Sequence, residues 1–171
     1  MARIVMKFDQ EKAVEAILYL SKRVSESEIY GICKLLYLVD KTSLERYGRF
    51  VFGESYVAMK EGATPFKAYD MLKKARRKPI DGLKVEGNQI IALREANMDC
   101  LSKSDVECLN QIIESFGKAP YLARREAAHD AAWEKAWNER GISGSSRMPI
   151  ENIAAIFPCS TELIDYLSNC A

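Results

Sequence analysis

The chain has 171 residues, of which 48% are hydrophobic and 29% charged, with 25 Lys and Arg against 24 Asp and Glu. This length predicts one domain over residues 1–171 with a substantial core, and the composition excludes wholesale disorder. A formal net charge of +1 gives no global attraction for nucleic acid. No apolar run approaches the roughly 18 residues of a membrane span, so we expect no membrane partner.

The five cysteines are odd in number and form no Cys-x-x-Cys pair, and the chain has a single histidine. This pattern argues against a zinc site and against a disulfide framework. The N-terminus lacks the apolar region of a signal peptide. We therefore expect a cytoplasmic protein with reduced thiols and no metal or cofactor.

The first half of the chain predicts two helices and a strand. Asp9 is a suitable N-cap for a helix of about 15 residues, and Ser25–Glu28 fits a capping box for the next helix. That second helix is apolar on two faces, which predicts burial between other elements. It ends at Tyr47-Gly48 because glycine adopts the left-handed C′ conformation without strain. Residues 56–60 predict a short strand.

A third helix and a hairpin follow. Thr64 is the expected N-cap, with Pro65 at the first helical position, and the helix must stop before Pro79. Its predicted apolar side carries Phe66, Tyr69 and Leu72. Gly87-Asn88 lies between two apolar runs, at 83–86 and 89–93, and is typical of a two-residue hairpin turn.

The second half predicts further helices. Ser102–Asp105 fits a capping box for a helix that ends at Gly117. A second helix is expected from Pro120 to about residue 140, then a flexible loop over 142–146. Two short helices divided by Pro158 complete the chain. The predicted fold class is mainly α with a small antiparallel β element (α+β), a helical bundle with a β-hairpin.

Five positive charges occur in the six residues from 73 to 78: Lys73, Lys74, Arg76, Arg77 and Lys78. Such a run can contact a partner or the phosphates of nucleic acid. It is also typical of a solvated helix C-terminus, where cations interact favourably with the helix dipole. We favour the second interpretation because no aromatic residue interrupts the run.

Two further positions could carry chemistry. His129 is followed by Trp133 and Trp137 at helical spacing, and we expect a structural histidine packed on the indoles, with a general base or a metal ligand as the alternative. Asp40 falls on the apolar side of the second helix. A buried carboxylate needs partners, so we expect contacts with an Arg, a Tyr hydroxyl or a backbone N–H, with a catalytic acid or a ligand contact as the alternative.

No phosphate-binding glycine loop, nucleophile motif or carboxylate cluster is present in the sequence. We therefore expect a protein that is not an enzyme and has no catalytic residues.

The order of several motifs resembles the Panacea domain family of SocA-like antitoxins. Lys34-Leu-Leu-Tyr37-Leu-Val-Asp40 is followed by Tyr47-Gly48-Arg49, then by a segment with Gly53, Tyr56 and Gly62, and later by His129 and Trp133. The resemblance is strongest over residues 10–140, and 141–171 would add a loop and short C-terminal helices. The chain departs from the family pattern at Phe50, Glu54, Ala63 and Ala128.

The resemblance implies an antitoxin of a type II toxin–antitoxin system, encoded by a prophage or mobile element, that neutralises a cognate protein toxin by direct contact. It also implies that the motif residues mainly hold the fold. Two rival functions stay open. One is a DNA-binding regulator with winged-helix features, in which residues 73–78 contact phosphates. The other is a small enzyme using Asp40 or His129.

Overall fold

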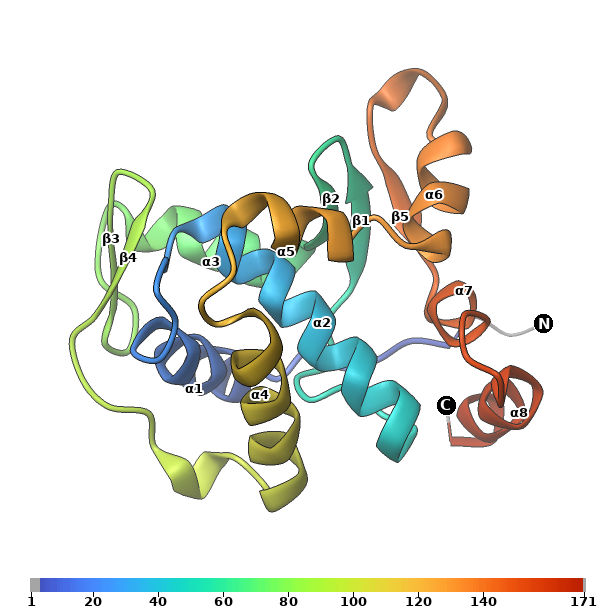
Figure 1. Ribbon diagram of the computed structural model, residues 1–171, viewed down its shortest axis with the longest axis horizontal. Helices are drawn as coiled ribbons and strands as arrows, with labels where there is room; N and C mark the ends of the chain where they lie inside the picture. The colour runs from blue at the N-terminus through green and yellow to red at the C-terminus, as the bar shows by residue number, and fades with distance from the viewer. Residues whose placement is uncertain (1–3, 171) are drawn as a thin grey trace.

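The computed structural model describes residues 4–170 (Figure 1). Helices account for most of the ordered backbone; the α-helices are α1 (Gln10–Ser21), α2 (Ile29–Tyr47), α3 (Phe66–Ala75), α4 (Lys103–Phe116), α5 (Tyr121–Ala127), α6 (Ala131–Asn138), α7 (Ile150–Ala154) and α8 (Ser160–Cys170). Two 3₁₀ turns, η1 (Met98–Cys100) and η2 (Gly141–Ser143), lie between them. Among residues 4–170, no helix combines the length and apolar character that crossing a bilayer requires.

The strands form two small antiparallel sheets. One sheet has the order β2-β1-β5 and the other pairs β3 with β4; the strands are β1 (Tyr56–Met59), β2 (Gly62–Pro65), β3 (Leu83–Glu86), β4 (Gln89–Ala92) and β5 (Ser146–Met148). The α+β fold class, mainly helical with small antiparallel sheets, is confirmed.

Helix α2 lies at the centre of the fold and contacts α1, α3, α4, α5, α7 and β2. Its apolar residues from Ile29 to Leu44 are almost all buried, as two apolar faces on one helix require. The β1–β2 hairpin lies in the upper middle of Figure 1, between α5 on one side and β5 with α6 on the other.

Several predicted local signals are confirmed. Asp9 caps α1 by accepting from the backbone N–H of Lys12, and Gly48 ends α2 with φ 67°. Ser102 and Asp105 form a complete capping box at α4. Glu86 pairs with Gln89 across the Gly87-Asn88 turn, as predicted. The two C-terminal helices lie on either side of Pro158.

The capping box predicted at Ser25–Glu28 is wrong. Helix α2 begins at Ile29, and the cap residue Glu28 makes no side-chain capping bond. The N–H of Ile29 instead donates to the carbonyl of Asn88, and the N–H of Ile90 donates to Ser27. The hairpin from 83 to 92 therefore supplies the acceptor at the start of α2 that the Ser25 and Glu28 side chains were expected to supply.

The start of α3 also differs from the prediction. Thr64 and Pro65 belong to strand β2, opposite Val57 and Tyr56, and the helix begins at Phe66. The carboxylate of Glu54 accepts from the backbone N–H groups of Lys67 (3.1 Å) and Ala68 (2.8 Å). A glutamate 13 and 14 residues away thus accepts from the free N–H groups of the first turn of α3. Thr64 is not needed as a cap and pairs in the sheet. Of the predicted apolar side, Leu72 is buried but Phe66 is exposed.

Residues 121–140 are two helices and not one. The chain breaks at 128–130, where Asp130 becomes the N-cap of α6 by accepting from the N–H of Trp133. The expected loop over 142–146 includes η2 and the first residue of β5, which pairs with β1.

Candidate protein-binding groove

Asp40 is fully buried in the centre of the fold, as its place on α2 predicted. Its carboxyl group accepts from the backbone N–H of Val51 at 2.7 Å and is hydrogen-bonded to the hydroxyl of Tyr56 at 2.8 Å. The Tyr56 hydroxyl also lies 3.2 Å from the carbonyl of Leu36. The expected tyrosine and backbone partners are therefore present, and they fasten the segment after α2 and the start of β1 to the middle of the helix.

Burial raises the pKa of Asp40 to about 8, against the opposing effects of these hydrogen bonds. At neutral pH the carboxyl group is then mainly protonated. Protonated Asp40 can donate to the Tyr56 hydroxyl, and Tyr56 can donate in turn to the carbonyl of Leu36. Each hydroxyl proton in this series of hydrogen bonds then has an acceptor. Both side chains are closed to solvent.

A second motif residue of α2 reaches the break between α5 and α6. The hydroxyl of Tyr37 donates to Asp130 at 2.6 Å, and the ammonium of Lys41 lies 2.9 Å from the same oxygen. Since the other oxygen of Asp130 caps α6, these contacts fix where α6 begins relative to α2.

The end of the β1–β2 hairpin is held by side chains from two helices and from the break between α5 and α6. Lys34 on α2 donates to the carbonyl of Ala63 at 3.1 Å and to the hydroxyl of Thr64 at 3.2 Å. The indole N–H of Trp133 donates to the carbonyl of Met59 at 2.9 Å. The ring of His129 contacts the carbonyls of Lys60 and Arg125. The structure thus brings Lys34, His129 and Trp133 together around one turn.

His129 and the two indoles form a ladder on the surface. The rings of His129 and Trp133 are 4.0 Å apart, those of Trp133 and Trp137 are stacked at 5.5 Å, and Arg140 covers Trp137. The predicted packing of histidine on indole is present. All three rings are only partly buried, however, because Ala132 and Ala136 form the inward face of α6. Both His129 nitrogens face carbonyl oxygens, which suits a structural role.

The remaining motif residues fix turns and helix ends. Arg49 pairs with Asp105 at 2.8 Å, and Tyr47 donates to Glu107 at 2.6 Å, which joins the end of α2 to α4. Gly53 has φ 65°, and a side chain there would collide with the carbonyl of Lys7. Gly62 has φ 108° and faces the His129 ring.

The outward face of the same hairpin borders a groove. A cavity of about 120 Å³ lies against α2 and opens beside a second hollow of about 340 Å³ that extends to β5. Met59, Thr64 and Tyr69 line both. We call this surface the hairpin groove; its other lining residues are Tyr30, Cys33, Lys34, Val57, Lys60, Glu61, Phe66, Lys73, Ser145, Ser146 and Arg147.

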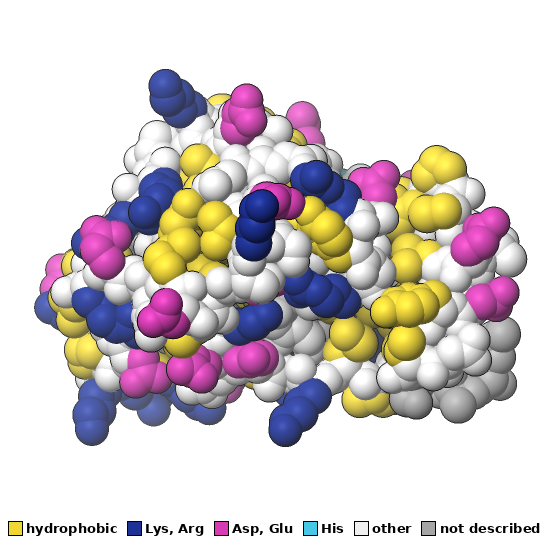
Figure 2. Space-filling view, turned by 90° about the horizontal axis from the view of Figure 1, so that it is seen from below, with side chains coloured by type: hydrophobic (Ala, Val, Ile, Leu, Met, Phe, Trp, Pro, Cys, Tyr) yellow, Lys and Arg dark blue, Asp and Glu magenta, His cyan; other side chains and the backbone are white. Residues whose placement is uncertain are grey.

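The hairpin groove exposes large apolar side chains. Phe66 is 61% exposed, Tyr30 40% and Met59 39%. The face at the bottom of Figure 1, away from the hairpin tip, has a different character: Figure 2 shows positive and negative side chains interspersed among separate hydrophobic patches. Exposed aromatic residues around a concave surface are typical of a protein-binding site.

The basic run from 73 to 78 lies at the exposed end of α3, as predicted. Lys74 pairs with Asp70 at 2.8 Å, and Lys73 lies over the ring of Tyr69. Arg76 donates to the carbonyl of Gly87 and to the side chain of Asn88, so the run is beside the β3–β4 turn. Arg77 and Lys78 are exposed.

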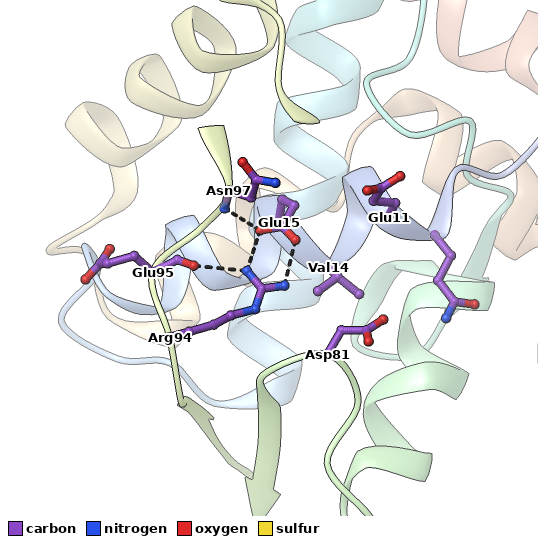
Figure 3. A pocket seen from close by; sticks show the side chains of 8 residues that line it. Glu11, Val14, Glu15, Asp81, Arg94, Glu95 and Asn97 are labelled. Atoms are coloured by element: carbon purple, nitrogen blue, oxygen red, sulfur yellow. Dashed lines mark hydrogen bonds and ion pairs between the residues drawn. The ribbon is translucent and has the colours of Figure 1, made fainter. Parts of the chain in front are cut away.

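Another hollow, of about 750 Å³, lies between α1 and the segment after β4 (Figure 3). In Figure 3 the side chains of Glu15 and Arg94 point toward one another, joined by hydrogen bonds of 2.7 and 2.9 Å. Glu15 also accepts from the N–H of Asn97, and its pKa is lowered chiefly by the bond to Arg94. These groups satisfy one another and fasten the segment to α1, so this hollow is not the candidate site.

Sequence reasoning missed Glu54 and the groove residues Tyr30, Met59 and Tyr69 as a group. No local sequence pattern indicates the groove residues, because they come from α2, β1 and α3 and are brought together only by the fold.

The structure is thus an α+β domain in which the β1–β2 hairpin is held by side chains of α2 and α6 and borders an exposed groove. The family model of the antitoxin SocA-like Panacea domain matches residues 32–134. This is more than half of the chain, and the chain belongs to that family. A search of curated proteins and a search of solved structures gave no match.

Proposed function

We propose that this protein is an antitoxin that neutralises a cognate protein toxin by stoichiometric binding in the hairpin groove, without turnover, as part of a type II system. The observation that supports the proposal most is the exposed cluster of Tyr30, Met59 and Phe66 around a groove within the family-matched segment. Aromatic side chains that fill pockets supply most of the energy of such interfaces. The buried, mutually satisfied contacts of Asp40 favour a structural role for it over catalysis.

Co-expression with the product of the adjacent gene tests the proposal. Growth should be restored, and the two proteins should co-elute in a fixed ratio. Phe66→Glu should abolish both results, whereas Leu122→Glu should not, because Leu122 is 65% exposed but lies outside the groove. Rescue at strongly substoichiometric levels with no complex would contradict the proposal.

A second candidate function is binding of DNA by a regulator. It is supported by the position of Arg77 and Lys78 beside the β3–β4 turn, to which Arg76 is bonded. Binding to a random duplex should then weaken steeply with salt, and Arg77→Ala with Lys78→Ala should reduce the salt dependence. Binding that neither salt nor these substitutions change would exclude this use of the basic run.

A further inference from the structure

Lys34 is a buried cation without a counter-ion. The residue is only 2% exposed, and none of the carboxylates of the described residues forms an ion pair with it. Its ammonium group has three N–H donors, and two acceptors are present, the carbonyl of Ala63 and the hydroxyl of Thr64. A buried charge of this kind is costly unless an opposite charge joins it.

Lys34 forms part of the wall of the 120 Å³ cavity of the hairpin groove. The other walls are mainly apolar and include Tyr30, Met59 and Tyr69. Glu61, the acidic residue of this lining, is already engaged by Arg125, whose Nε lies 2.7 Å from it. The cavity therefore presents a cation within apolar walls, and its volume suits a side chain and excludes a nucleotide.

The hairpin groove as a whole is positively charged, like the Lys34 cavity within it. Lys34, Lys60, Lys73 and Arg147 line it, against Glu61 alone among acidic residues of the described lining. The complete chain carries a net charge of only +1. Positive charge is thus concentrated where the large apolar side chains are exposed, and an occupant with complementary charge is acidic.

We propose that the Lys34 cavity receives an acidic side chain from an extended segment of the partner protein that lies along the hairpin groove. The carboxylate would accept the remaining N–H of Lys34, while its aliphatic stem would contact Tyr30, Met59 and Tyr69. The inference rests on the proposed function for the existence of a protein partner. It adds the chemistry by which that partner is recognised.

Ionisation of Lys34 gives the proposal a pH dependence. The titratable and charged groups around the ammonium are Cys33 on α2, Glu61 in the hairpin turn and Arg125 on α5, and burial lowers the pKa of Lys34 to about 8. Only the protonated form pairs with a carboxylate. Affinity should therefore fall about tenfold between pH 7 and pH 9, as most of the Lys34 population loses its proton.

The test uses the purified protein and three synthetic peptides, followed by two-dimensional amide NMR. The first is acetyl-Ala-Leu-Glu-Leu-Ala-amide, the second has Gln in place of Glu, and the third is the Gln peptide with a free carboxyl terminus. The Glu peptide should shift the amides of Tyr30, Lys60 and Thr64, with at least tenfold higher affinity than either Gln peptide. Equal affinity for the Glu and amidated Gln peptides would overturn the proposal. Preference for the Gln peptide with a free carboxyl terminus would also overturn the proposal, because the cavity would then bind a C-terminal carboxylate and not an acidic side chain.

Lys34→Met should remove the preference for Glu, whereas Lys118→Met, at an exposed position outside the groove, should keep it. If Lys34→Met fails to fold, the pH series on the wild-type protein decides, and an affinity that is equal at pH 7 and pH 9 would overturn the proposal. No toxin enters these measurements. Peptide binding that persists when the toxin does not bind would therefore refute the proposed function alone.

Discussion

The β1–β2 and β3–β4 hairpins have strands of the same length and a two-residue turn each, yet different parts of the molecule hold them in place. The β3–β4 hairpin turns at Gly87-Asn88, where Gly87 has φ 61° with open space around it. The β1–β2 hairpin turns at Lys60-Glu61, and the carbonyls of that tip accept from Trp133 and Lys34. The β3–β4 hairpin has a Gly-Asn turn signal of its own and is also bonded along the backbone to Ser27 and Ile29. The β1–β2 hairpin has no such turn signal and is held by side chains up to 74 positions away.

The two hairpins also occupy different places in the fold, one packed in the core and one beside the groove. The β3–β4 hairpin buries Leu83, Val85 and Ile90 and packs on α1 and α3. The β1–β2 hairpin is fixed from inside by family-motif residues and carries the hairpin groove on its outer face. A binding surface on a short hairpin needs such support, because a two-stranded hairpin has little stability of its own.

The largest predicted effect is at Asp40, which anchors the entry to β1. Asp40→Ala should lower the free energy of unfolding by about 3–5 kcal/mol, because it leaves the N–H of Val51 without its acceptor and opens a cavity. Asp40→Asn should stay within about 1 kcal/mol of wild type at pH 7, since the amide can donate to Tyr56 as a protonated carboxyl does. Urea unfolding measures both. An alanine variant as stable as wild type but unable to bind the toxin would assign Asp40 to function.

The same residue sets a pH dependence. The pKa of Asp40 rises from 3.8 to about 8 on folding, so the folded protein binds the extra proton. Stability should therefore fall as pH rises from 5 to 8, and Asp40→Asn should flatten most of that decline. Glu54, whose pKa burial also raises, contributes in the same direction. A wild-type stability that rises over this range would contradict the protonated state of Asp40.

The second prediction compares one glycine in each hairpin. Gly62→Ala should cost about 2–3 kcal/mol, because φ 108° strains an alanine and the new methyl lies 3.2 Å from the His129 ring. Gly87→Ala should cost about 1 kcal/mol, the ordinary cost of a left-handed residue with free space. Thermal unfolding of the two variants gives the order. Equal losses would show that contact with the His129 ring adds nothing to the stability of the β1–β2 hairpin.

The same contrast decides how far the sequence predicts this fold. Gly87-Asn88 and the Ser102–Asp105 box act through neighbours two or three residues apart, and both are confirmed. The cap from Glu54 and the break at Asp130 depend on partners 13 to 93 residues distant, and neither was predicted. The motif residues themselves could be identified by resemblance. The groove could not, because its side chains are brought together only by α2, β1 and α3.

A third prediction isolates the hydrogen bond from the Trp133 indole to the β1–β2 hairpin. Trp133→Phe keeps an aromatic ring next to His129 and Trp137 but removes the N–H that donates to Met59. The free energy of unfolding should fall by about 1 kcal/mol, and amide exchange should quicken in the β1–β2 turn and not at Gly87-Asn88. Trp137→Phe is the matched control. Uniform acceleration in both hairpins would indicate that Trp133 supports the whole fold and not this hairpin in particular.

The smallest predicted effect tests whether the β3–β4 turn needs a long side chain to hold it. Arg76 is the long-range side chain bonded to its turn, at 2.9 Å from the carbonyl of Gly87 and 2.7 Å from Asn88. Both bonds lie at the exposed surface, where water replaces them easily. Arg76→Ala should therefore change the free energy of unfolding by less than about 0.5 kcal/mol. Arg77→Ala, one residue further along, controls for the loss of positive charge. If Arg76→Ala destabilised the protein as much as Trp133→Phe, the β3–β4 turn would depend on a clamp as well, because its own Gly-Asn chemistry and buried strands would then be insufficient to hold it.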